Sequence, residues 1–186
     1  MGESTLLQYV DDILLCSPLK EILVLATTSL LNFLADMGYW VSPAKAQPSL
    51  SQVTYLRLAL TPTTRALTAD RVAAIKALLP PTSGAEILSF LGLVGFFRHW
   101  VLNFALLARP LYAAATETPT GLLTSPTKVA SAFNQLQDAL LSSPPLMLPD
   151  LTKPFTLYTA EREGVATGVL VQPVRPGYHP VAFLSS

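Results

Sequence analysis

The amino-acid sequence predicts an α+β fold, and two observations lead to this prediction. Short apolar runs of β-like composition, residues 6–10 and 13–16, lie on either side of the adjacent acids Asp11 and Asp12. From Thr68 onward the apolar residues instead recur at helical spacing, and strand-like runs return only after residue 155. Short apolar runs bounded by polar residues indicate strands, whereas recurrence every three to four residues indicates helices.

The first stretch predicts a hairpin with both acids at its tip, followed by a helix. Residues 17–18 offer a serine N-cap and a first-turn proline, and apolar residues then recur at helical spacing until Gly38 ends the helix. We expect the apolar face of this helix to cover a sheet. Further strands are expected at residues 39–41 and 53–60, separated by a loop that contains proline and serine.

A helical unit is expected next. Thr68 is placed to cap a helix over residues 69–79, and residues 83–86 form a capping box ahead of a second helix. Helical spacing favours the core over base stacking for three aromatic residues, Phe96, Phe97 and Trp100. A linker is expected at residues 116–127 and a helix at residues 128–141. Three strands are expected after them, at residues 155–158, 165–172 and 181–184.

The composition excludes several classes of protein. Of the 186 residues, 51% are hydrophobic and 13% are charged, a balance opposite to that of an intrinsically disordered chain. The longest charge-free helical stretch is 14 residues, from residue 22 to residue 35. A membrane-spanning helix needs about 18 to 20 apolar residues, so we expect no transmembrane segment.

Cysteine usage and the first residues bear on the compartment. Cys16 is the only cysteine, which excludes an intramolecular disulfide and a cysteine-based zinc site and indicates a reducing compartment. Residues 1–6 contain neither the basic region of a signal peptide nor a myristoylation motif. We therefore expect an intracellular protein, cytoplasmic or nuclear.

The zero net charge conceals an asymmetry along the chain. Residues 1–36 contain five acids and one base, whereas residues 37–116 contain seven bases and two acids. The remaining residues, 117–186, carry a net charge of −1. An acidic element followed by a basic one is the balance expected where metal ions meet a polyanion such as nucleic acid. The alternative is chance scatter in a sparsely charged chain.

The adjacent aspartates point to a metal. Asp11 and Asp12 repel each other unless a positive group lies beside them. Mg²⁺, with Mn²⁺ as a substitute, is the natural partner, because polymerase sites hold hard cations through carboxylates and substrate phosphates. A solvated turn is the alternative for an isolated Asp-Asp pair. The tetrapeptide Tyr-Val-Asp-Asp at residues 9–12, set between apolar strands, is more specific than the pair alone.

Motifs along nearly the whole chain carry a resemblance to a known family. Residues 7–12 read Leu-Gln-Tyr-Val-Asp-Asp, and residues 42–47 read Ser-Pro-Ala-Lys-Ala-Gln. Further matches follow at residues 53–60, 89–96, 108–112 and 148–155. In this order, the motifs resemble those of the reverse transcriptases of gammaretroviruses and of related mammalian endogenous retroviruses, within the Pol polyprotein.

The resemblance implies three structural parts and an activity. The C-terminal part of a polymerase palm is expected at residues 1–67, a helical thumb at 68–116, and the start of an RNase H-like connection at 117–186. The implied activity is RNA-directed DNA polymerisation, with RNA or DNA primer-template and deoxynucleotides as partners.

The resemblance also implies roles for individual residues. Asp11 and Asp12 would be two of three palm carboxylates that hold Mg²⁺, with Tyr9 and Val10 near the primer end and the incoming nucleotide. Lys45 matches a lysine near the nucleotide phosphates, with an ordinary solvated lysine as the alternative. Residues 53–60 resemble the primer-grip hairpin of the family, which implies primer positioning for Tyr55 and Leu56, with a buried strand as the alternative. The basic segment adds two residues expected to contact the nucleic-acid backbone, Arg98 and Arg109.

Departures from the family pattern change what we expect of the chain. The fingers and the palm strand with the third aspartate do not occur in this sequence, so we expect little or no polymerase activity without a partner that supplies them. Arg57 stands at a primer-grip position where the family has glycine, and Ala160 stands where an acid is usual. His99 and His179 have no partner at ligand spacing, and we assign them no chemistry. The alternatives are a non-enzymatic nucleic-acid-binding remnant and an open reading frame without a selected role.

Overall fold

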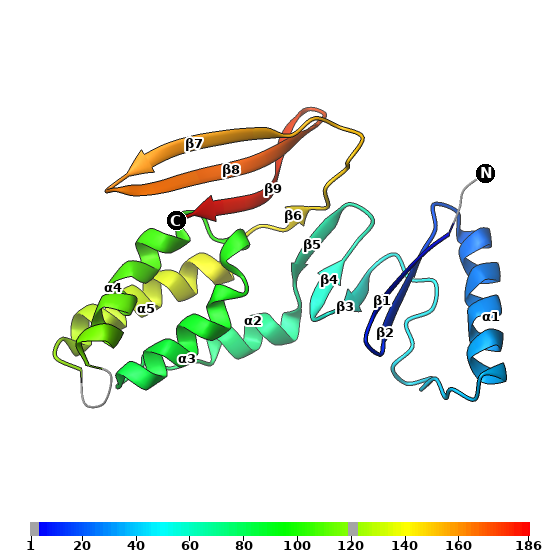
Figure 1. Ribbon diagram of the computed structural model, residues 1–186, viewed down its shortest axis with the longest axis horizontal. Helices are drawn as coiled ribbons and strands as arrows, with labels where there is room; N and C mark the ends of the chain where they lie inside the picture. The colour runs from blue at the N-terminus through cyan, green and yellow to red at the C-terminus, as the bar shows by residue number, and fades with distance from the viewer. Residues whose placement is uncertain (1–3, 119–122) are drawn as a thin grey trace. The chain divides into compact units, whose positions relative to one another are not determined.

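The computed structural model describes residues 4–118 and 123–186. It divides into two compact units, Met1–Pro62 and Thr63–Ser186. Both units combine helices with antiparallel strand pairs (Figure 1), which confirms the predicted α+β fold.

The first unit contains two hairpins and one long helix. Strand β1 (Thr5–Tyr9) pairs with β2 (Asp12–Cys16), and the register places Tyr9 opposite Asp12. Helix α1 (Lys20–Asp36) follows, and Gly38 ends it with a left-handed φ of 80°, as the sequence predicts. The second hairpin joins β3 (Val53–Tyr55) to β4 (Leu58–Leu60).

The apolar face of α1 is only partly covered. No residue of α1 is buried, and Leu25, Phe33 and Met37 are all largely exposed. In fact, none of residues 4–62 is buried. Half-buried residues nevertheless recur along one face of the helix, at Ile22, Ala26, Leu30 and Leu34. Because α1 contacts β2, the helix lies against the first hairpin as predicted, but two short hairpins are too small to bury a helix of 17 residues.

Two strand predictions in this unit also need correction. Residues 39–41 form no strand, although they are apolar and aromatic, because they have no pairing partner among the described residues. Residues 53–60 form the β3–β4 hairpin that the resemblance implies, with Leu56 and Arg57 as its turn, and not the single strand that their apolar pattern predicts. Their alternating apolar pattern continues through the turn and hides it.

The second unit contains the helical segment and the C-terminal strands. Strand β5 (Thr64–Leu67) pairs with β6 (Leu146–Met147). The helices are α2 (Ala69–Lys76), α3 (Gly84–Gly95), the 3₁₀ turn η1 (Arg98–Trp100), α4 (Phe104–Glu117) and α5 (Pro126–Leu141). An antiparallel meander closes the unit, with β7 (Thr156–Arg162), β8 (Val165–Val174) and β9 (Gly177–Ser185) in that order. Part of the predicted linker, residues 119–122, lies outside the described residues.

The core of the second unit lies among its helices. Phe90 of α3 packs against Phe133 of α5 with 4.5 Å between ring centroids. Phe97 and Trp100 are buried, as predicted for core aromatics, whereas Phe96 is exposed. Within residues 4–118 and 123–186, no helix is long and apolar enough to cross a membrane.

Both predicted helix caps form. The hydroxyl of Thr68 accepts a hydrogen bond from the amide of Arg71, and that of Ser83 accepts one from the amide of Glu86. The Glu86 carboxylate turns back to Thr82, whose amide and hydroxyl both donate to it, at 2.7 and 3.0 Å. These hydrogen bonds lower the pKa of Glu86.

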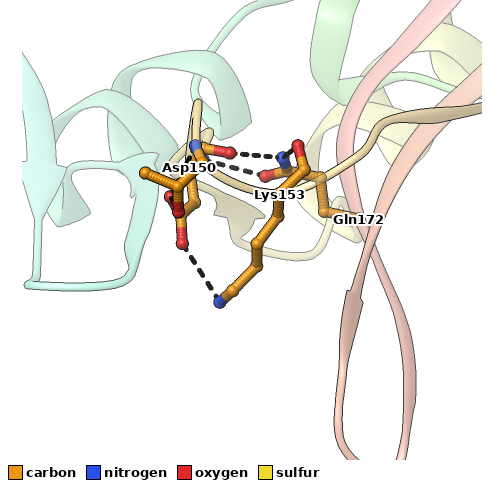
Figure 2. A network of polar contacts seen from close by, with 4 residues as sticks. Asp150, Lys153 and Gln172 are labelled. Carbon is orange, nitrogen blue, oxygen red and sulfur yellow. Dashed lines mark hydrogen bonds and ion pairs between the residues drawn. The ribbon is translucent and has the colours of Figure 1, made fainter.

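A buried glutamine ties the segment before β7 to β8 (Figure 2). Gln172 is fully buried, and its side chain accepts from the amide of Asp150 while donating to the carbonyls of Asp150 and Lys153. The Asp150 carboxylate accepts from the amide and hydroxyl of Thr152 and pairs with Lys153 at 3.1 Å. The meander is therefore held to its preceding loop by polar contacts as well as by packing.

Candidate catalytic hairpin and nucleic-acid interface

The two aspartates lie at the tip of the first hairpin, as the sequence predicts. Val10 and Asp11 form the two-residue turn, and Asp12 opens β2 opposite Tyr9. Tyr9, Val10, Asp11 and Asp12 are all exposed, so neither carboxylate is desolvated. The hairpin therefore presents two acidic side chains to solvent at a place where two apolar strands end.

Val10 has an unusual backbone conformation. Its φ is 54°, in the left-handed region that a β-branched residue rarely adopts, and 78% of its surface is exposed. The side chain of Gln8 donates to the carbonyl of Val10 at 3.1 Å and supports the turn. Strained, exposed residues of this kind are found mainly at functional sites, which makes the tip of the hairpin a candidate site.

The oxygen ligands of the acidic pair are of the type that Mg²⁺ prefers. Carboxylate oxygens are the hard ligands that this ion prefers, and one or two of them suffice when substrate phosphates and water complete the shell. Among residues 4–118 and 123–186, no group of three His, Cys, Asp or Glu side chains could hold a metal ion. The described residues thus offer two carboxylates and no third at this place.

Lys45 lies in an exposed turn that is bound to the second hairpin. Its amide and that of Ala46 both donate to the carbonyl of Ser42, each at 3.1 Å. Two residues later, the side chain of Gln47 forms two hydrogen bonds with the backbone of Thr54 in β3. The structure thus links the Lys45 loop to the hairpin that contains Tyr55.

The second hairpin has a turn without glycine. Leu56 and Arg57 both have left-handed φ angles, 49° and 64°. Two successive positive φ angles define a type I′ turn, in which glycine or asparagine is preferred because other side chains crowd their own backbone. The position of Arg57 therefore favours glycine for backbone reasons. Leu56 is 36% exposed, so a buried strand is the wrong interpretation for it, while Tyr55 is half-buried in β3.

The four basic residues between residues 63 and 100 divide into two groups. Arg65 and Arg71 lie over aromatic rings, with guanidinium carbons 5.0 Å from the Trp100 centroid and 5.5 Å from that of Phe97. Lys76 and Arg98 are exposed and form no ion pair with any described residue. Arg98 and His99 also line an open cavity of about 350 Å³ against β7, β8 and β9.

Arg109 has a partner that the sequence does not indicate. Its guanidinium donates to the carbonyl of Glu163 at 3.1 Å and pairs with the Glu163 carboxylate at 3.2 Å. Glu163 lies 54 residues along the chain, in the turn between β7 and β8. Both side chains are more than half exposed, so this ion pair is weak and remains open to competition.

Sequence reasoning missed two residues that organise these regions. Gln47 belongs to a noted motif, but only the structure reveals that it bonds the backbone of Thr54. Arg65 was counted among the bases, whereas it lies over Trp100 and donates to the carbonyl of Val181. Arg65 lies beside Thr64 in a strand of only four residues, and this short run carries no sequence signal for either contact.

Comparisons with known proteins identify what this chain is similar to. Residues 127–186 match the family described as the RNase H-like domain found in reverse transcriptase. The chain is 47% identical over 183 residues to the Pol polyprotein of feline endogenous virus ECE1, covering 98% of this chain and 17% of that protein. It is 46% identical over 183 residues to the Gag-Pol polyprotein of baboon endogenous virus (strain M7), covering 98% and 10%. The chain thus spans less than a fifth of the length of these relatives.

Solved structures show the same fold. A foamy viral protease-reverse transcriptase in complex with double-stranded DNA matches with a TM-score of 0.85 at 24% identity, over 97% of this chain and 37% of that one. The foamy viral enzyme in complex with an RNA/DNA hybrid matches with a TM-score of 0.84 at 24% identity, over 97% and 24%. From the sequence and fold together, the homologues of this chain are retroviral Pol and Gag-Pol polyproteins, and the chain resembles their reverse transcriptase and RNase H region.

Proposed function

We propose that this chain contributes two catalytic carboxylates and a nucleic-acid-binding surface to an RNA-directed DNA polymerase. The observation that carries the proposal is the first hairpin, where Asp11 and Asp12 are exposed beside the strained Val10. In this proposal, residues 1–67 form part of a palm, 68–116 a thumb and 117–186 a connection segment. The similarity to Pol polyproteins along nearly the whole chain supports an origin in that region, and the division itself follows the order of the sequence motifs.

Each residue around the hairpins has a chemical role in the proposal. Asp11 and Asp12 would hold Mg²⁺, which would supply charge stabilisation for attack of a primer hydroxyl on the α-phosphate of a deoxynucleoside triphosphate, with pyrophosphate as the leaving group. Val10 and Tyr9 would face the primer end and the nucleotide, and Lys45 would contact the nucleotide phosphates. Two residues of the second hairpin would position the primer, Tyr55 and Leu56.

Nucleic acid is the proposed macromolecular partner. The foamy viral structures hold double-stranded DNA and an RNA/DNA hybrid, and their fold matches this chain over 97% of its length. The exposed Arg98 and Lys76 offer positive charge for phosphate contacts, which position a duplex without reading its sequence. Arg109 joins this surface when a phosphate displaces Glu163 from its guanidinium.

The 186-residue chain on its own is not expected to polymerise. Two adjacent carboxylates without a third cannot fix a pair of ions in the geometry of in-line transfer, and geometry supplies much of the rate. Activity is therefore expected only when fingers and an upstream palm strand are present together with these residues. Complementation of this kind is the direct test of the proposal.

The experiment is primer extension with Mg²⁺ or Mn²⁺ on an RNA template. The chain is assayed alone and mixed with a fingers and upstream-palm fragment of a related enzyme. We expect extension only in the mixture, and we expect Asp11→Asn or Asp12→Asn to abolish it. Extension by the chain alone would overturn the requirement for a partner. A mixture that never extends, or one that is indifferent to both substitutions, would overturn the catalytic role.

A second candidate is a nucleic-acid-binding remnant without chemistry. The exposed bases Lys76 and Arg98, which pair with no acid in the described part of the chain, favour it, because they need no acidic pair to contact phosphate. Salt-dependent duplex binding by a chain that fails complementation would select this candidate. A product without a selected role, the remaining alternative, would show neither binding nor complementation.

A further inference from the structure

The side-chain amide of Gln47 forms a two-point clamp on one strand residue. Its Nε2 donates to the carbonyl of Thr54 at 2.9 Å, and the amide of Thr54 donates to its Oε1 at 2.7 Å. Thr54 lies opposite Ala59 in the hairpin. The amide and carbonyl of a strand residue point to the same side, so both Thr54 groups face the edge away from β4. Gln47 thus provides hydrogen-bond partners for the backbone groups of Thr54 at that edge, as a neighbouring strand would.

The clamp fixes the turn that carries Lys45. At one end of this turn, the carbonyl of Ser42 accepts hydrogen bonds from the amides of Lys45 and Ala46. At the other end, Gln47 is tied to Thr54, the residue before Tyr55. Lys45 itself is exposed and has no ion-pair partner among the residues the structure describes. Its backbone is therefore placed relative to the hairpin, while its ammonium group remains available.

We infer that Gln47 is a positioning residue, which holds Lys45 and the Tyr55 hairpin in one arrangement so that both act on the same end of a nucleic acid. The inference rests on the proposed function, because it takes Lys45 as a phosphate contact. A flexible lysine gains more from a phosphate when its backbone is fixed beforehand, since less conformational entropy is lost on binding.

The clamp can be removed without unfolding the chain. Gln47 is exposed, and a solvent-exposed hydrogen bond contributes little net stability. Gln47→Met keeps the length of the side chain and removes both hydrogen bonds, whereas Gln47→Asn keeps the amide but is one methylene too short to reach Thr54. Gln52→Met, at another exposed glutamine of the same segment, is the matched control.

The test is a double-mutant cycle on binding of a deoxynucleoside triphosphate to the full chain that already holds a DNA primer annealed to an RNA template. Lys45→Ala should lower the affinity for the nucleotide and reduce the slope of that affinity with salt, the effect of one lost phosphate contact. Gln47→Met and Gln47→Asn should each lower affinity about threefold, in the range of one hydrogen bond. Gln47→Met should cost nothing further in the Lys45→Ala background, and Gln52→Met should leave binding unchanged.

The possible outcomes distinguish a failure of the positioning role of Gln47 from a failure of the proposed role of Lys45. A Gln47→Met effect that adds fully to Lys45→Ala, or no effect of Gln47→Met where Lys45→Ala has one, overturns the positioning role alone. Absence of salt-dependent nucleotide binding by the unaltered chain, or a slope that Lys45→Ala does not change, overturns the role of Lys45 in the proposed function. Amide exchange at Thr54 is the independent check on the clamp, and it should accelerate in Gln47→Met.

Discussion

The guanidinium group of Arg65 lies over the indole ring of the buried Trp100, 5.0 Å from its centroid. The same group donates from Nη2 to the carbonyl of Val181 in β9, at 3.1 Å. Burial lowers the pKa of Arg65, because desolvation disfavours the charged form. One side chain from β5 therefore connects η1 to the C-terminal meander within the second unit.

Replacing this side chain should destabilise the second unit. We expect Arg65→Met to lower the free energy of unfolding by roughly 1 to 3 kcal/mol, the sum of a cation–π contact and one hydrogen bond from a charged donor. Urea denaturation followed by tryptophan fluorescence measures the change. The exposed Lys76→Met is the control, and an equal shift in both variants would show that the contacts of Arg65 carry no special weight.

Removing the buried amide of Gln172 should have a larger effect. Gln172→Leu leaves the amide of Asp150 and the carbonyls of Asp150 and Lys153 without their partner. We expect a loss of about 2 to 4 kcal/mol in unfolding free energy, the usual cost of unsatisfied polar groups. The exposed Gln135→Leu on α5 is the matched control. Unchanged stability of Gln172→Leu in urea denaturation would mean that water replaces the amide at no cost.

Much of the fold could be predicted from local patterns. Thr68 and Ser83 cap helices because their hydroxyls lie three residues before amides that need acceptors, and this signal is visible in the sequence. The turn at Leu56 and Arg57 was not visible, because neither residue is a usual type I′ turn former. Local alternation of apolar residues through the turn indicates one strand, and only the resemblance to a primer-grip hairpin implies a turn in this segment.

The candidate site was predictable only where its chemistry is local. Asp11 and Asp12 are adjacent in the sequence, so their motif can be recognised from the sequence alone. Gln47 bonds a backbone seven residues away, and Arg65 bonds one that is 116 residues away. Neither contact has a side-chain signature at its far end, since a carbonyl occurs at every residue. Such contacts follow from the packed structure and not from sequence spacing.

The two arginines predicted to contact nucleic acid should differ in effect. Arg98 has no ion-pair partner among the described residues, whereas Arg109 is paired with Glu163. A phosphate must displace Glu163 to reach Arg109, so Arg98→Ala should weaken duplex binding more than Arg109→Ala. Each lost phosphate contact lowers the salt slope by about 0.9 and acts alike on all sequences. A larger effect of Arg109→Ala in salt-titrated binding would reverse this ranking.

Glycine at position 57 should relieve strain in the β3–β4 turn. Arg57 has a φ of 64°, where a residue with a Cβ atom pays about 1 kcal/mol or more relative to glycine. We expect Arg57→Gly to stabilise the hairpin by about that amount, measured by amide exchange in β3 and β4. Arg57→Ala removes the guanidinium but keeps the Cβ, so it should give no such gain. Equal protection in both variants would trace the effect to charge and not to backbone conformation.

The carboxyl group of Asp150 should make the folding stability depend on pH. Hydrogen bonds from Thr152 and then the contact with Lys153 lower the pKa of Asp150 from 3.8 to about 2. Because the folded pKa is below the unfolded one, the unfolded chain binds more protons in this range, and stability falls as pH falls from about 4 towards 2. Asp150→Asn removes this titration.

Urea midpoints of the unaltered chain and of Asp150→Asn test this prediction between pH 6 and pH 2.5. The unaltered chain should be the more stable above about pH 4, because only a carboxylate pairs with the Lys153 ammonium. The difference between the two chains should shrink on acidification, as the carboxylate is protonated. Lys153→Met, which keeps the Thr152 hydrogen bonds, should retain most of the pH dependence, since Thr152 is the larger cause of the shift. A constant difference across the range would mean that Asp150 titrates alike in the folded and unfolded chains.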